Sequence, residues 1–120
     1  MALSPKELLN QLMQTEGAMC AALVDYNSGM LLESVGSGLD LELAAAGNTE
    51  VVRAKMKTMK SLNLNDDIED ILISLHRQYH IIRPLEKHDG LFLYYVLDRS
   101  RSNLAMARRK LLEAESQATL

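Results

Sequence analysis

Two histidines are the most conspicuous candidates for metal chemistry in this sequence. His76 and His80 are four residues apart, a spacing that brings two imidazoles to one metal ion when both lie on a helix. The surrounding residues favour strands, however, and no nearby cysteine or evident third ligand completes a site. We therefore expect ordinary surface or edge histidines and no metal site.

A run of side chains with oxygen atoms precedes these histidines and could suggest calcium binding. It consists of Asn63, Asn65, Asp66, Asp67, Glu69 and Asp70. The run lacks the glycine after the third ligand position and the distal glutamate of a calcium loop. Helix capping and a solvated connector explain these residues better.

The remaining candidates for chemistry are equally incomplete. Cys20 lies in an apolar stretch, so we expect a buried, inert thiol. Gly36 and Gly38 precede a predicted helix, but the third glycine of a dinucleotide-binding turn and the lysine of a P-loop are both missing. No nucleophile, base and oxyanion donor are brought together by spacing. We expect no catalytic residues, no cofactor and no enzyme activity.

Composition indicates an ordinary globular domain. Hydrophobic residues make up 48% of the 120 residues and charged residues 24%, and the formal net charge is −3. Such a mild charge argues against electrostatic capture of nucleic acid or of a membrane surface, and the basic residues near the end of the chain are better explained as a solvated helix face. We expect one domain over 1–120. A single cysteine and a start without the pattern of a secretory signal favour a cytoplasmic location.

The pattern of apolar residues and turn signals divides the chain into eight elements. Ser4, Pro5 and Glu7 form the start signal of a helix that should end near Gly17. The expected strands are 18–26, 30–35, 68–76, 79–85 and 91–98. The other expected helices are 40–62 and one from about Ser100 or Ser102 to Gln117. The strand over 91–98 is apolar at every position, which places it at the centre of the sheet. The order αββαβββα predicts an α/β (α+β) fold with a five-stranded antiparallel sheet and helices on both faces.

Gly47, which follows three alanines, lies in the middle of the long predicted helix. Glycine there costs about 1 kcal/mol relative to alanine, so we expect a close neighbour. That neighbour is either the protein's own sheet or a helix of a partner.

The chain resembles the Roadblock family of dynein light chains and its bacterial relatives, with the profilin-like outline of that fold. The resemblance rests on 21–25 followed by the turn at 27–29, on 80–85, and on 91–98 leading into 103–108. It extends from about Ser4 to Glu115.

This resemblance implies a non-catalytic homodimer that pairs its third strand with the same strand of a second copy. An open apolar edge over 68–75 supports the idea independently, because isologous pairing would satisfy its backbone groups. Six residues are expected at the dimer interface: Ile68, Asp70, Leu72, Ser74, Ala46 and Gly47. Four more on the long helix are expected to bind a partner: Leu43, Glu50, Arg53 and Lys57.

The family resemblance also implies what that partner is. Family members serve as regulators of small Ras-like GTPases or as scaffolds of motor complexes. We therefore expect a GTPase regulator or scaffold first, and a structural adaptor in a motility or cytoskeletal assembly second. A small-molecule sensor of similar outline is a third hypothesis, and it predicts an internal cavity.

Overall fold

The computed structural model describes residues 2–118, which form three helices and five strands. The elements are α1 (Pro5–Leu12), β1 (Ala18–Asp25), β2 (Met30–Gly36), α2 (Leu41–Ser61), β3 (Ile71–Ser74), β4 (Gln78–Pro84), β5 (Leu91–Asp98) and α3 (Leu104–Gln117). All neighbouring strands are antiparallel, and the spatial order is β2-β1-β5-β4-β3. The predicted fold class and element order are thus confirmed. Within the described residues, no helix has the length and apolar character needed to cross a membrane.

Each helix begins at a side chain that satisfies its free amide groups. Ser4 and Glu7 form a reciprocal capping box at α1, with Pro5 in the first turn. Asp40 accepts from the amide of Leu43 at α2, and Asn103 accepts from the amide of Met106 at α3. These short polar residues place the helix starts at definite positions in the sequence.

Strand β5 occupies the centre of the sheet, as its uninterrupted apolar sequence predicts. Residues 92–97 are all buried, and β5 pairs with β1 on one side and β4 on the other. Successive side chains point to opposite faces, so both faces of β5 must be covered.

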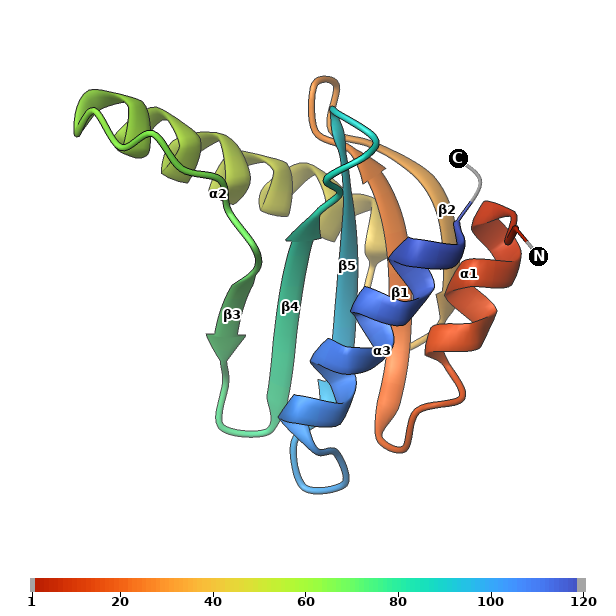
Figure 1. Ribbon diagram of the computed structural model, residues 1–120. Helices are drawn as coiled ribbons and strands as arrows, with labels where there is room; N and C mark the ends of the chain where they lie inside the picture. The colour runs from red at the N-terminus through yellow and green to blue at the C-terminus, as the bar shows by residue number, and fades with distance from the viewer. Residues whose placement is uncertain (1, 119–120) are drawn as a thin grey trace.

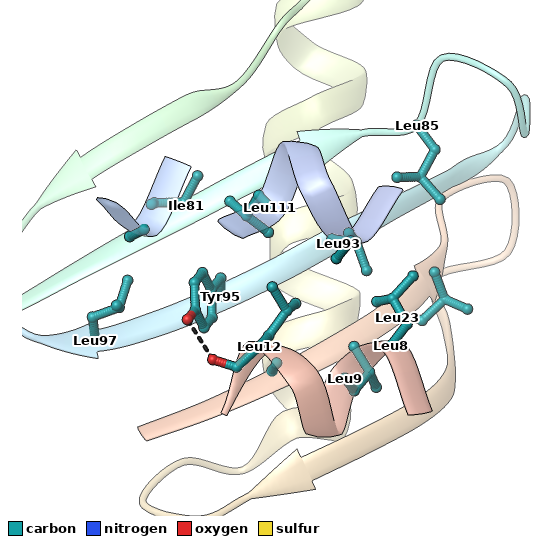
Figure 2. Packing of buried hydrophobic residues seen from close by; sticks show 13 residues of the cluster. Leu8, Leu9, Leu12, Leu23, Ile81, Leu85, Leu93, Tyr95, Leu97 and Leu111 are labelled. Atoms are coloured by element: carbon teal, nitrogen blue, oxygen red, sulfur yellow. Dashed lines mark hydrogen bonds between the residues drawn. The ribbon is translucent and has the colours of Figure 1, made fainter. Parts of the chain in front are cut away.

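The helices divide between these two faces (Figure 1). Helices α1 and α3 lie on one face, where they bury Leu93, Tyr95 and Leu97. Figure 2 shows this cluster and the hydrogen bond from the Tyr95 hydroxyl to the carbonyl oxygen of Leu12, at 2.6 Å. Helix α2 crosses the other face and covers a second cluster that includes Phe92 and the fully buried Cys20. Burial raises the pKa of the Cys20 thiol to about 11, consistent with an inert side chain.

Three elements have predicted boundaries that differ from the structure by more than one residue. Helix α1 ends at Leu12, and a series of turns fills the chain up to Gly17. Helix α3 begins at Leu104 because the preceding residues form a turn closed by Asp98 and Ser100. Strand β3 covers only Ile71–Ser74, whereas the sequence predicts a strand over 68–76.

A buried ion pair fastens α3 to the end of β4. Arg83 Nε donates to Glu115 Oε1 at 2.7 Å, and both side chains are less than one-tenth exposed. The second carboxylate oxygen of Glu115 accepts from the amide of Glu86 at 2.8 Å. This carboxylate therefore satisfies a buried guanidinium and a backbone donor together.

We expect Glu115→Ala to lower the free energy of unfolding by about 3–5 kcal/mol, because it leaves the charge of Arg83 buried without a partner. Urea unfolding followed by circular dichroism measures this change. The control is Glu113→Ala, two residues earlier, because Glu113 contacts only exposed basic side chains. That substitution should cost less than about 1 kcal/mol. Equal losses for the two variants would contradict the assigned role of Glu115.

Candidate interaction surface

The two edge strands of the sheet differ in whether side chains from other elements contact their backbone. At the β2 edge, Lys6 Nζ donates to the carbonyl oxygen of Ser34 at 3.0 Å and contacts Glu33 at 3.5 Å. At the β3 edge, within residues 2–118, no side chain makes a hydrogen bond to a backbone group of 71–74. A lysine that reaches over a strand edge from a neighbouring helix hinders pairing with another chain, whereas an open apolar edge favours it. The β3 edge is therefore the one available for strand addition.

Strand β3 is shorter than predicted because both of its ends are held by side chains. Asp70 precedes the strand and receives two hydrogen bonds from Arg108 of α3, at 3.0 and 3.1 Å. After the strand, the amide of Leu75 donates to the carbonyl oxygen of Gln78, which closes a tight turn at 76–77. Arg99 donates to the carbonyl oxygen of Leu75 and lies over the ring of Tyr79.

The four predicted interface residues near β3 therefore have different positions. Leu72 and Ser74 are in the strand and face the α1–α3 side with their partners Ile81 and Tyr79 on β4. Asp70 is engaged by Arg108, and Ile68 lies outside the strand in the extended connector. The sequence did not indicate the long-range pairing of Asp70 with α3.

Helix α2 continues past the sheet. Its first half packs on β1 and β2, with Ala45, Thr49 and Val52 buried. Its second half projects beyond β4 and β3 on the side of the open edge (Figure 1). An open groove of about 490 Å³ separates this part of α2 from the connector to β3, and Val51, Met59 and the half-exposed Leu64 line it. A groove with apolar side chains on α2 and the acidic residues of the connector opposite them thus lies directly beside an open strand.

Gly47 faces away from the sheet. No atom lies within 4 Å of the position that a Cβ would occupy, so the expectation that Gly47 allows α2 to lie close on its own sheet is wrong. Ala46 is also exposed, and Leu43, one turn before Gly47, is 71% exposed. The alternative expectation, a contact with a partner helix, remains a prediction.

The predicted partner-binding residues share the outer side of α2. Leu43, Glu50 and Lys57 are seven residues apart, which places them on one side of a helix, and all three are exposed. Arg53 is exposed too, but its Nη2 donates to the carbonyl oxygen of Asn27 at 3.2 Å. Arg53 therefore connects α2 to the turn between β1 and β2, in addition to any external role.

A polar network connects α2 to the sheet beneath it. The Tyr94 hydroxyl donates to Nδ1 of His80 at 2.7 Å, and Nε2–H of His80 donates to Gln78 Oε1 at 2.8 Å, the tautomer being assigned from these partners. Burial raises the pKa of Tyr94, and a hydrogen bond from the side chain of Asn48 opposes this effect. Burial also lowers the pKa of His80. His80 is therefore held as a neutral imidazole.

This network makes the stability dependent on pH. The unfolded chain protonates His80 near the ordinary pKa of about 6.5, whereas the folded protein resists protonation until a lower pH. Between these values the unfolded state holds more protons, so the contribution of His80 is complete above about pH 7 and is lost as the pH falls. We expect the stability difference between the wild type and His80→Gln to shrink from about pH 7 to about pH 5, measured by urea unfolding. Parallel curves would contradict this, and His88→Gln, in the loop between β4 and β5, serves as the control.

The two histidines considered as metal ligands lie in different environments. His76 is exposed in the turn after β3, whereas His80 lies under the Tyr94 ring edge. In the described part of the chain, no group of three or more His, Cys, Asp or Glu side chains is placed to hold a metal ion.

Comparison with known proteins identifies the fold. No family model and no curated protein sequence matches this chain. Among solved structures, a Roadblock/LC7 domain from Streptomyces avermitilis superposes with a TM-score of 0.80 at 14% identity, covering 97% of this chain and 93% of that one. Myxococcus xanthus MglB gives 0.76 at 17% identity, covering 94% and 86%. The gliding protein MglB from Thermus thermophilus gives 0.71 at 18% identity, covering 93% and 88%. At these identities the likeness concerns the fold, and this chain has the fold of the Roadblock/LC7 domains.

Proposed function

We propose that this chain is a non-catalytic, cytoplasmic homodimer that binds a small Ras-like GTPase as its regulator or scaffold. The observation that carries the proposal is the open apolar β3 edge beside the overhanging half of α2. Antiparallel pairing of two β3 strands satisfies the unpaired backbone groups of both copies and extends the sheet across the two-fold axis. The same pairing brings the overhanging α2 of each copy toward the other copy.

The interface in this proposal is apolar at its centre. Ile71 and Ile73 of β3 are half-buried and face the α2 side of the sheet, next to Ile82 and His80. Val51, Leu62 and Leu64 are exposed on or near the overhanging part of α2. A second copy would cover these residues, whereas Ala46 and Gly47 lie in the half of α2 that packs on β1 and β2, away from the β3 edge.

The outer side of α2, defined by Leu43, Glu50 and Lys57, is the proposed docking surface for the GTPase. It combines one large exposed apolar side chain with charges of both signs, the composition of a site recognised by contact and charge pattern together. The GTPase assignment itself rests on the resemblance to the Roadblock family.

A structural adaptor in a motility assembly is the second candidate. The observation that favours it is the likeness of the fold to the gliding protein MglB from Thermus thermophilus. Both candidates use the same dimer, and they differ in whether a GTPase binds and whether its nucleotide turnover changes.

The dimer is tested by measuring the mass by light scattering across a dilution series. We expect a dimer at micromolar concentration and a dissociation constant raised at least about tenfold by Ile73→Lys, which places two like charges beside the two-fold axis. The matched control is Leu32→Lys on the opposite edge strand, where the side chain is already half exposed. A wild-type protein that stays monomeric would overturn the proposed dimer.

The partner is tested by titrating small GTPases of the same cell, loaded with GDP or GTP, and following binding by calorimetry. We expect nucleotide-dependent binding that is weakened about tenfold or more by Glu50→Lys with Lys57→Glu, because both charges on the docking surface are reversed. Glu16→Lys with Arg109→Glu provides a control away from α2 with the same net charge change. Unchanged affinity in the α2 variant would refute the assigned surface, and an absence of binding to every GTPase would favour the adaptor.

A further inference from the structure

The two ends of β3 carry opposite charges. The connector before the strand holds three exposed carboxylates, those of Asp66, Asp67 and Glu69. The turn after the strand holds the exposed side chains of His76 and Arg77. Acidic and basic groups are thus separated by the length of one short, open strand.

These groups form no ion pair within the described part of the protomer, although Asp66 Oδ1 accepts from the amide of Asp67 at 2.8 Å. Asp70, the fourth acid of the connector, forms the ion pair with Arg108, and its side chain is only 11% exposed. Among residues 2–118, no ion pair involves Asp66, Asp67, Glu69, His76 or Arg77. The charges nearest the open edge therefore remain available to another molecule.

We propose that the charges at the two ends of β3 are a recognition device for a second copy of this chain, selecting antiparallel pairing and rejecting parallel pairing. The inference rests on the homodimer through β3 proposed above and assigns the groups that orient it. Its basis is charge complementarity: a strand that begins acidic and ends basic is complementary to an antiparallel copy of itself. In a parallel pair, each end would meet its own sign.

The complementarity appears when the register is continued past the four residues of β3. With the two-fold axis at Leu72, Asp67 is opposite the partner's Arg77, and with the axis at Ile73, Glu69 is opposite the partner's Arg77. The symmetry repeats each pair, so every dimer has the contact at both ends of the joined strands.

The turn that carries the basic end is held in place by its own contacts. The amide of Arg99 donates to the carbonyl oxygen of Arg77 at 2.9 Å, and the Arg99 guanidinium donates to the carbonyl oxygen of Leu75. At the acidic end, the bidentate contact of Asp70 with Arg108 fixes the start of the strand. The backbone of the turn and of the start of the strand is thus fixed before a second copy arrives, which reduces the entropy lost on pairing.

The test exploits this symmetry with two variants that reverse one end each. The first is Asp67→Lys with Glu69→Lys, which makes both ends basic. The second is His76→Glu with Arg77→Glu, which makes both ends acidic. All four side chains are exposed, and circular dichroism checks that the variants fold.

We expect each variant alone to dimerise at least about tenfold more weakly than the wild type, because like charges meet at both ends. An equimolar mixture should recover the wild-type affinity as a heterodimer, since each reversed end then meets an opposite charge. The dissociation constants are measured by sedimentation equilibrium, with mass-labelled subunits to identify the heterodimer. Increasing salt should weaken the wild-type dimer, because these charges are exposed to solvent.

The outcomes separate this inference from the proposed function. A dimeric wild type whose variants dimerise equally well, or whose mixture stays as weak as its components, overturns the charge selection and leaves the dimer intact. A monomeric wild type overturns both. The remote reversal Glu16→Lys, three strands away from β3 in the sheet, should leave dimerisation unchanged, and a comparable loss in that variant would also refute the inference.

Discussion

The burial of β5 on both faces is the constraint on which the rest of the structure depends. Its residues 92–97 are closed to solvent, so neither face of the sheet can be left bare at its centre. Two helices cover one face and one long helix covers the other. Helix α2 alone covers its face, and it crosses the sheet and extends beyond the last strand (Figure 1).

Because β5 lies at the centre, the strands with unpaired backbone groups are β2 and β3 at the two edges. A five-stranded open sheet has two edges, and unpaired strand edges favour association with other chains. In this protein Lys6 covers part of the β2 edge, while side chains hold only the two ends of β3. The edge left open is also the one over which α2 extends. The open strand edge and the extension of α2 therefore lie on one side of the molecule, together with the exposed Val51, Leu62 and Leu64.

Most of the fold could be predicted because its signals are local. The capping residues Ser4, Asp40 and Asn103 fix the helix starts, and the uninterrupted apolar run of β5 identifies the central strand. The length of β3 was overestimated because apolar periodicity continues through 68–75, whereas the ladder ends where Asp70 turns to Arg108. Contacts between residues far apart in the sequence, such as Arg83 with Glu115, have no local signal. For the same reason the sequence could not decide which neighbour packs against Gly47. The spacing of apolar residues places Gly47 on the helix but carries no information about the element opposite it.

Helix α2 also determines how dimerisation and docking relate in the proposed assembly. Its buried side holds it to the sheet, and Arg53 and the network of Asn48, Tyr94 and His80 add polar contacts. One residue turns a helix by 100°, so the groove side at Val51 and the docking side at Glu50 point in different directions. A second copy on the groove side therefore leaves the docking side free, and the two-fold axis joins two docking sides into one larger surface. A partner that contacts both copies binds the dimer more tightly than the monomer, and by linkage it stabilises the dimer by the same free energy.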